Sequence, residues 1–353
     1  MKRHTYNIFA LCSAVMALAS CAGHDSPYHG DADGLYSMTL TIDPGTLGPR
    51  GAREFITGEE DGVRFDRMIL TGSVNAALYT YSGNGLELAA RIEPYYDAAT
   101  VAPDGLVLLS GRIAPVIDID RLKSESVKLM VTANSDFDFD LPESMTFSKG
   151  GAFSDFDAIP MWGAKDISLG SLTPGTAFDA GAVDMLRAMA AIEVLWPEDM
   201  RGSRLVSVRV DNAAESGCVA PSGWNTHLNT SAINNADPFR HKADTGLSTL
   251  YTEAADGKAH IYLPESLNVA ETPVAVNVNY VTAEGESMSG RILIARYIDG
   301  KPDMTTLWNV RRNRIYRFNI VGIPNPDIPG AEFEWEFRIN DWIPGDDILI
   351  EED

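Results

Sequence analysis

The chain has 353 residues, with 50 acidic side chains against 28 lysines and arginines and a formal net charge of −22 at pH 7. An acidic balance of this size repels phosphate backbones and anionic lipid surfaces, so it argues against nucleic-acid binding. A chain of this length can bury enough apolar surface for two domains.

Residues 1–20 have the features of a bacterial export signal. Two basic residues at positions 2 and 3 precede an apolar stretch at 6–20, which is too short to span a bilayer as a permanent helix. The stretch ends in Leu18-Ala19-Ser20-Cys21, the pattern that lipoprotein processing recognises. We therefore expect cleavage between Ser20 and Cys21, and acylation of the Cys21 thiol by fatty acids such as palmitate. Each buried methylene contributes about 0.8 kcal/mol, so this lipid would hold the mature protein at a membrane outside the cytoplasm.

The cysteines exclude an intramolecular disulfide in the mature chain. Cys12 leaves with the signal, Cys21 carries lipid, and Cys218 is left alone. A lone cysteine of this kind is expected to be buried as a small apolar residue. Stability must therefore come from apolar burial.

The start of the mature chain predicts a leash, a strand and a long loop, in that order. Residues 21–34 are polar and turn-prone, and are expected to form a flexible leash between lipid and fold. Apolar and polar side chains alternate through Tyr36–Ile42, which predicts a strand with one buried face. The segment Pro44–Gly62 then breaks every period and carries Arg50 and Arg53. Exposed loops of this kind are where proteases cut, so these two arginines are candidate cleavage sites.

Short strands separated by Gly, Pro, Asn and Asp clusters fill most of the remaining chain. Many such strands, with no run of amphipathic helices, predict an all-β fold of β-sandwiches. The segment Val183–Trp196 fits both a 3.6-residue period and a period of two, so periodicity leaves it open between helix and strand. The predicted strands are Val74–Tyr81, Leu106–Leu109, Val127–Thr132, Leu205–Val210, His260–Leu263, Val274–Tyr280, Arg291–Ala295 and Ile315–Ile320.

The clearest strand pattern lies near the C-terminus. Phe333, Trp335, Phe337 and Ile339 share one face of the predicted strand, which would be a sticky edge in isolation. Earlier in the chain, proline and glycine interrupt the pattern between residues 173 and 182. This interruption predicts two domains, at residues 35–180 and 181–353.

No pattern of residues points to catalysis, a metal or a cofactor. The histidines show no ligand-like spacing to one another or to Cys218, which argues against a zinc site. The segment Gly285–Gly290 misses the spacing of a serine-hydrolase elbow by one residue. Asp136, Asp138 and Asp140 alternate, as Asp118 and Asp120 do, and carboxylates on one strand face could ligate calcium or act as a glycosidase pair. We favour the alternative that they form a solvated strand face of an acidic protein.

Several phrases, in this order along the chain, resemble the fimbrillins, the lipoprotein-derived pilus subunits (type V pilus) of Bacteroidales-type anaerobes. Two departures concern packing: Trp162 stands where the family has a small polar residue, and Ala191 stands where it has lysine. The phrases are Leu129-Met130-Val131-Thr132-Ala133-Asn134, Ile159-Pro160-Met161-Trp162-Gly163, residues 186–194, Tyr262-Leu263-Pro264-Glu265 and residues 311–320.

The resemblance implies two tandem transthyretin-like Greek-key β-sandwich domains, with residues 186–194 mostly a strand that opens the second domain. It also implies assembly by strand exchange. In such pilins an arginine-specific protease cuts the loop after the first strand, and a strand from a neighbouring subunit takes its place, which is a form of β-augmentation. This sequence offers the strand Tyr36–Ile42, the arginines of the following loop, and a donor at Phe333–Ile339 or in the tail Ile343–Ile350. Head-to-tail exchange of this kind builds an open filament.

The expected function is thus a non-enzymatic fimbrillin-like subunit of a cell-surface pilus that contributes to adhesion. It would be held at the cell outer membrane by lipid on Cys21 and move to the fimbrium after processing. Its partners would be other fimbrial subunits and host or bacterial surface receptors. Two alternatives remain open: an uncleaved anchor or tip subunit, and a surface glycan-binding lipoprotein. A lipid-anchored hydrolase would need carboxylates such as Asp118, Asp136 and Asp138 to meet in a cleft.

Overall fold

A computed structural model describes most of the chain beyond residue 34. Cys21, Arg50 and Arg53 lie outside the described residues, as do five of the six histidines and most of the tail. The described residues are 35–43, 69–70, 72–83, 85–94, 100–101, 107–136, 138–140, 146–147, 150–151, 158–198, 200–226, 230, 245–298, 300–323, 333–341 and 348–349.

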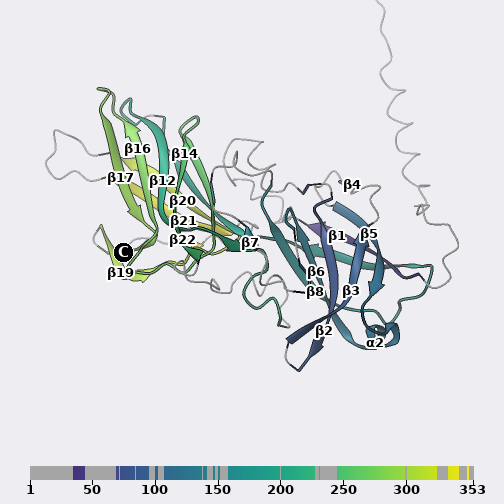
Figure 1. Ribbon diagram of the computed structural model, residues 1–353. Helices are drawn as coiled ribbons and strands as arrows, with labels where there is room; N and C mark the ends of the chain where they lie inside the picture. The colour runs from purple at the N-terminus through teal and green to yellow at the C-terminus, as the bar shows by residue number, and fades with distance from the viewer. Residues whose placement is uncertain are drawn as a thin grey trace, which may run out of the picture.

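The described residues form almost only β-structure, arranged in two lobes (Figure 1). One lobe is a single nine-stranded sheet with the order β10–β8–β6–β2–β3–β5–β1–β9, in which β4 pairs with β5. Its strands are β1 (Ser37–Asp43), β2 (Asn75–Ser82), β3 (Gly85–Pro94), β4 (Thr100–Val101), β5 (Val107–Pro115), β6 (Ser126–Ala133), β8 (Met161–Ser168), β9 (Ala177–Asp184) and β10 (Leu186–Arg187).

This sheet curls so that β8 and β9 come close to each other. The Lys165 ammonium on β8 donates hydrogen bonds to the β9 carbonyls of Ala180, at 2.7 Å, and Ala182, at 3.0 Å. Gly163 allows the approach, because a Cβ there would collide with the carbonyl oxygen of Asp184 and lie 2.7 Å from the sulfur of Met185. The curled sheet encloses one apolar core, which the short helix α2 (Ile119–Ser124) covers with Leu122.

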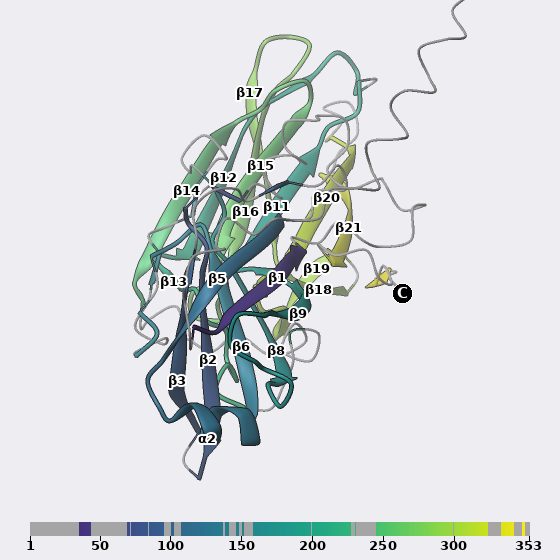
Figure 2. The same ribbon diagram turned by 90° about the vertical axis from the view of Figure 1, so that its right-hand side faces the viewer.

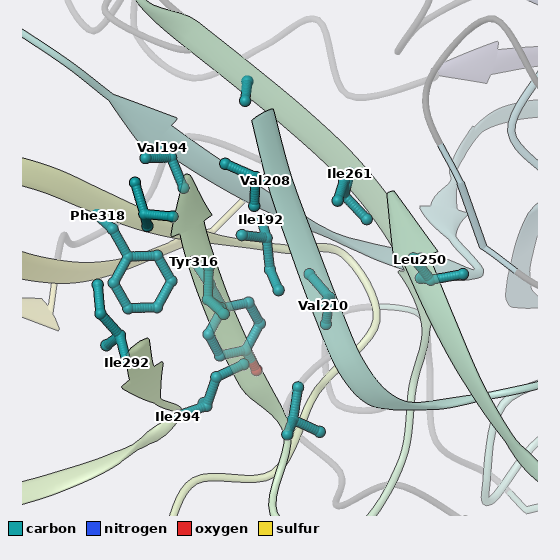
Figure 3. Close-up of a cluster of buried hydrophobic side chains, with 14 of the residues drawn as sticks. Ile192, Val194, Val208, Val210, Leu250, Ile261, Ile292, Ile294, Tyr316 and Phe318 are labelled. Atoms are coloured by element: carbon teal, nitrogen blue, oxygen red, sulfur yellow. The ribbon is translucent and has the colours of Figure 1, made fainter. Parts of the chain in front are cut away.

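The other lobe packs a five-stranded sheet on a four-stranded sheet. The first has the order β15–β11–β20–β21–β22 and the second β14–β12–β16–β17. Their inward side chains, among them Ile192, Phe318, Val208 and Ile292, form one core (Figure 3). The strands are β11 (Met189–Leu195), β12 (Arg204–Ala214), β14 (Leu247–Glu253), β15 (Lys258–Pro264), β16 (Ala275–Val281), β17 (Ser287–Leu293), β20 (Arg314–Gly322), β21 (Glu334–Asp341) and β22 (Ile348–Leu349), with a separate hairpin of β18 (Ala295–Ile298) and β19 (Lys301–Leu307).

Two segments cross between the lobes. From the first lobe, β7 (Thr146–Phe147) pairs with β13 (Gly217–Cys218), and Gly151 exchanges two 2.8 Å backbone hydrogen bonds with Tyr262 of β15. From the second lobe, the segment after β13 packs Val219, Ala220 and Trp224 against the outer face of the first sheet. These crossings give the two lobes a shared apolar contact.

Buried polar groups fix the segment that follows β13. The ammonium of Lys128, on the outer face of β6, is fully buried and donates to the carbonyls of Trp224, at 3.3 Å, and Thr226. Arg312 pairs with Glu265 at 2.6 Å and donates to the carbonyls of Cys218 and Val219. An arginine buried in this way satisfies carbonyls that would otherwise lack donors.

The predicted all-β fold is confirmed, and each predicted strand overlaps an observed one. Val183–Trp196, left open by its periodicity, is extended: it holds the end of β9, then β10 and β11. The pattern did not predict β3, β8, β9, β14 or β19. β9 and β10 both belong to the sheet of the first lobe, whereas β11 belongs to the second lobe. We therefore propose that the boundary between the two domains lies near Ala188.

Within the described part of the chain, no helix is long and apolar enough to cross a membrane. The helix α2 is one short turn-like segment that begins after Asp118, whose carboxylate accepts from the backbone N–H groups of Asp120 and Arg121.

Candidate functional site

The candidate site is β1 together with the cleft between β5 and β9 that this strand fills. Figure 2 shows β1, in purple, lying between these two strands. It pairs antiparallel with β5, from Ser37 opposite Arg112 to Ile42 opposite Val107. On its other side it pairs parallel with β9. Its start is fixed by backbone hydrogen bonds from Ile113 to the carbonyl of Tyr36, at 2.9 Å, and from Gly175 to that of Leu35, at 3.0 Å.

Three aliphatic side chains anchor β1 in the core of the first sheet. Met38 and Ile42 are fully buried, and Leu40 is 2% exposed. Thr39 and Thr41, between them, face outward and are half-buried. Successive side chains of a strand point to opposite faces, so the alternation in the sequence places every apolar residue inside. Burial of each anchor contributes roughly 1.5–3 kcal/mol.

The pairing of β1 with β9 contains a β-bulge opposite Leu40. The register shifts between Thr39 and Thr41, and Gly181 of β9 adopts a φ of +67°, which glycine tolerates without steric cost. The N–H of Gly181 donates to the carboxylate of Asp179 at 2.8 Å. A local bulge leaves part of this edge without ladder hydrogen bonds, so β1 is held less firmly by β9 than by β5.

The two donor segments that the sequence suggests occupy different places. The strand β21 is built into the core of its own lobe: Phe337 stacks on Phe318, with ring centroids 4.7 Å apart, and on Trp308, at 5.0 Å. Phe333 covers Gly290, where a Cβ would lie 2.6 Å from the ring. The described part of the tail is β22, which pairs with β21 through Arg338 opposite Leu349 and Ile339 opposite Ile348.

The aspartates that suggested calcium or catalysis do not share a strand face. Residues 134–140, as far as they are described, lie beyond the end of β6. The Asp138 carboxylate accepts from the N–H of Asp140 at 2.9 Å, and Asp140 pairs with Arg91 at 2.6 Å. The expectation of a solvated strand face is therefore wrong, because the chain turns here. Among the residues that the structure covers, no cluster of three or more His, Cys, Asp or Glu could hold a metal ion.

The remaining candidates have structural roles. Cys218 is buried, as expected, and Gly285 lies in the turn between β16 and β17 with a φ of +89°. His260 of β15 lies 3.8 Å from the carboxylate of Glu193, which also binds Arg317. Burial raises the pKa of Glu193 above its usual value, and the nearby Arg317 only partly opposes this rise.

Sequence reasoning missed the buried charges Lys128, Glu193 and Arg312. Each lies in a strand or loop, where a charged side chain is normally expected to be exposed to solvent. Only the placement of Lys128 and Glu193 among apolar neighbours, in Val-Lys-Leu-Met and Ile-Glu-Val, hinted that these faces are covered.

No protein-family model matches the chain, and no curated protein matches it. Similar solved structures include the tip fimbrial protein Mfa3 from Porphyromonas gingivalis with a C-terminal truncation, at 14% identity, 87% coverage of this chain, 100% of that chain and a TM-score of 0.46. A candidate cell adhesion protein from Parabacteroides distasonis is similar at 14% identity, 87% and 100% coverage and a TM-score of 0.43. The fimbrial anchor protein Mfa2 from P. gingivalis is similar at 7% identity, 87% and 98% coverage and a TM-score of 0.34. These structural neighbours are thus fimbrial and cell-adhesion proteins of the Bacteroidales.

Proposed function

We propose that this protein is a fimbrillin-like structural subunit of a cell-surface pilus, exported as a lipoprotein through Cys21 and assembled by strand exchange. The observation that carries the proposal is the position of β1 between β5 and β9. This strand fills a cleft between two strands that are distant in sequence, and three aliphatic side chains anchor it.

The chain that connects β1 to β2 offers sites at which a protease could release β1. The chain between β1 and β2 spans residues 44–74 and carries Arg50 and Arg53, the proposed cleavage sites. A cut there would leave β1 attached to the fold by non-covalent contacts alone. Withdrawal of the strand would then expose the backbone of β5 and β9 and three apolar pockets, a template for another strand.

The cleft also defines which strand can replace β1. The replacement must run parallel to β9 and present aliphatic side chains at every second position, as Met38, Leu40 and Ile42 do. Phe333–Ile339 carries three aromatic rings on its apolar face, and packing rings into aliphatic pockets strains a close-packed core. The tail Ile343–Ile350 carries no aromatic ring and places the aliphatic residues Ile348 and Ile350 two positions apart, so it can fill two of the three pockets. We therefore propose the tail of a second copy as the donor.

An arginine-specific protease provides the test. Cleavage of the intact protein should remove β1 and give multimers that survive SDS. The connection between β1 and β2 also holds Arg64 and Arg67, so the control variant replaces all four of its arginines by lysine. This variant keeps the charge of the connection but should resist the protease there, so it should stay monomeric. If the cut protein remains monomeric at high concentration, the stalk-subunit function is wrong.

The N-terminal residue of the protein recovered from cells separates the roles within a pilus. Gly51 or Glu54 at the N-terminus would indicate a processed, polymerised subunit. Acylated Cys21 would indicate an anchor or tip subunit that keeps its own first strand.

A further inference from the structure

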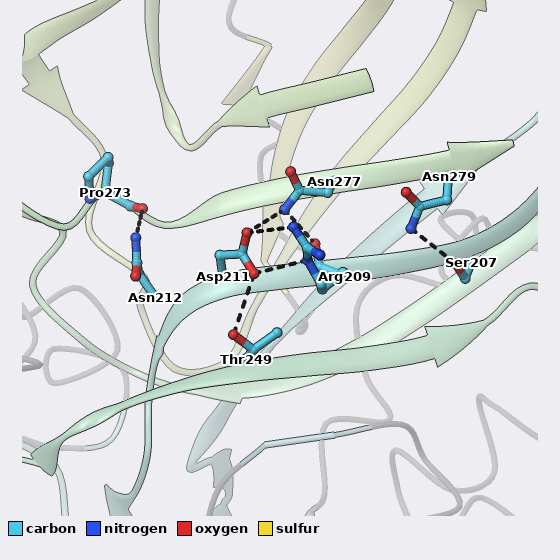
Figure 4. Close-up of polar contacts among 8 residues, drawn as sticks. All are labelled: Ser207, Arg209, Asp211, Asn212, Thr249, Pro273, Asn277 and Asn279. Atoms are coloured by element: carbon cyan, nitrogen blue, oxygen red, sulfur yellow. Dashed lines mark hydrogen bonds and ion pairs between the residues drawn. The ribbon is translucent and has the colours of Figure 1, made fainter. Parts of the chain in front are cut away.

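The outer face of the sheet β14–β12–β16–β17 is a polar surface whose side chains are held in place (Figure 4). The inward side chains of these strands belong to the core, so the alternate residues lie on the outer face, where their neighbours largely cover Ser207 and Asn277. The outward residues are Thr249, Tyr251 and Glu253 of β14; Arg204, Ser207, Arg209 and Asp211 of β12; Asn277 and Asn279 of β16; and Ser289 and Arg291 of β17.

A β-bulge in β12 shapes the centre of this face. The register with β14 shifts between Val210 and Ala213, and Asn212 adopts a φ of 60°, which is uncommon for a residue other than glycine. The side-chain amide of Asn212 donates to the carbonyl of Pro273 at 2.9 Å and holds this conformation. Bulges of this kind re-aim side chains and are frequent next to functional sites.

Asp211, beside the bulge, organises its neighbours. Its carboxylate accepts from Arg209 at 3.0 and 3.1 Å, from Asn277 at 2.8 Å and from Thr249 at 3.4 Å. Asn279 donates to the hydroxyl of Ser207 at 3.1 Å. These bonds fix the amides and the guanidinium before any ligand arrives, which reduces the entropy lost on binding.

One row across the four strands combines a ring, two guanidiniums and an amide. Tyr251 pairs with Arg209, Arg209 with Asn277, and Asn277 with Arg291. The spacing of strands places Arg209 and Arg291 about 10 Å apart. Tyr251 is 53% exposed, and Leu247 on the same side of β14 is 44% exposed. The row therefore offers apolar contact at Tyr251 and guanidinium donors at Arg209 and Arg291.

The side chain of Arg291 has no hydrogen bond or ion pair to another residue within the described part of the chain. This is notable because the chain holds 50 acidic residues against 28 basic ones. Asp211 and Glu253 are the acids on the face, and Asp211 is already neutralised by Arg209. The row thus presents positive charge on a protein that is otherwise strongly negative.

We propose that this row binds a carboxylated polysaccharide. Arg291 and the outer edge of Arg209 would bind sugar carboxylates, because guanidinium and carboxylate match in a planar, bidentate geometry. The amide of Asn279 would bond a hydroxyl group, and the ring of Tyr251 would lie against the apolar face of a sugar. The proposal goes beyond pilus assembly, since it assigns a receptor chemistry to a surface remote from β1.

The intact, uncleaved protein serves for the test, so its outcome is independent of strand exchange. Mobility is measured in separate native gels that contain hyaluronan, polygalacturonate, dextran or dextran sulfate. The first two polymers are carboxylated, dextran is neutral and dextran sulfate is sulfated. Both carboxylated polymers should retard the protein, while dextran and dextran sulfate should not. Arg291→Gln should weaken the retention roughly tenfold or more, as expected for the loss of a charge-assisted hydrogen bond. Tyr251→Ala should weaken it as well.

Arg296→Gln is the matched control, because Arg296 is an exposed arginine on β18, outside this face. It removes the same charge and should leave retention unchanged. Absence of retention by both carboxylated polymers would overturn the proposal. Equal retention by dextran or dextran sulfate, or an equal effect of Arg296→Gln, would show unspecific attraction and overturn it too. Urea unfolding of each variant verifies that the fold is kept.

Discussion

Shortening the central anchor of β1 tests how firmly this strand is held. Leu40→Ala removes three carbons from a side chain that is 2% exposed, a loss of about 2.4 kcal/mol in transfer free energy. The backbone of β1 is hydrogen-bonded to β5 and β9, so the strand cannot move inward to fill the space. A cavity therefore remains, and the total loss should lie in the upper half of roughly 2–5 kcal/mol.

Urea unfolding of the intact protein measures this loss. Thr39→Ala is the control: it shortens the neighbouring side chain, which faces outward, and should cost about 1 kcal/mol or less. If both substitutions destabilise the protein equally, Leu40 is not the anchor that its burial indicates.

The same substitution also tests the exchange of strands. Once the loop is cut, β1 with Leu40→Ala should leave sooner, so SDS-resistant multimers should form faster than in the unsubstituted protein. The finished multimer should be as stable as before, because a donor strand has replaced β1. A multimer that keeps the destabilisation would refute replacement of β1.

Three further predictions concern groups that hold the lobes. Burial lowers the pKa of Lys128 from 10.5 to about 8. Between these two pH values the unfolded chain binds a proton that the folded chain has lost, so the unfolding free energy should rise with pH. Urea unfolding across pH 7–11 should show this rise in the unsubstituted protein and not in Lys128→Met. Arg312→Ala should lower the unfolding free energy by about 3 kcal/mol, because it leaves the Glu265 carboxylate, whose side chain is 11% exposed, without its partner. Arg121→Ala at an exposed pair should change the unfolding free energy little, and comparable effects of the two substitutions would contradict this difference in exposure. Gly163→Ala should destabilise by about 1–3 kcal/mol through its collision with the backbone of Asp184, whereas Gly83→Ala, with open space around it, should be neutral in the same denaturation assay.

The sequence predicted those features that depend on local pattern. The alternation through Met38, Leu40 and Ile42 was sufficient to predict a strand and to say which side chains are buried. Phe337 and its apolar neighbours were assigned to one face for the same reason. The position of a side chain on a strand depends only on its place in the two-residue period, so this information is complete in the sequence.

The sequence predicted secondary structure less well where two periodic patterns compete or where the pattern is interrupted. Val183–Trp196 fits two periods, and pairing with β8, β15 and β20 makes it extended. The segment of β9 was interpreted as a domain boundary because Gly175 precedes it and Gly181 interrupts it, whereas Gly181 supplies the bulge opposite β1. Glycine has the same local preference in a loop and in a bulge, so its role depends on the neighbouring strand.

Only the tertiary structure determined which strands meet. It placed β1 between β5 and β9, buried Lys128 beneath a segment about a hundred residues further on, and aligned Tyr251, Arg209, Asn277 and Arg291 in one row. Each of these contacts joins residues that are far apart in the chain, and strand pairing over such distances is selected by the packing of the whole core. The sequence by itself determined the strand and its buried face, and the fold determined the cleft that the strand fills.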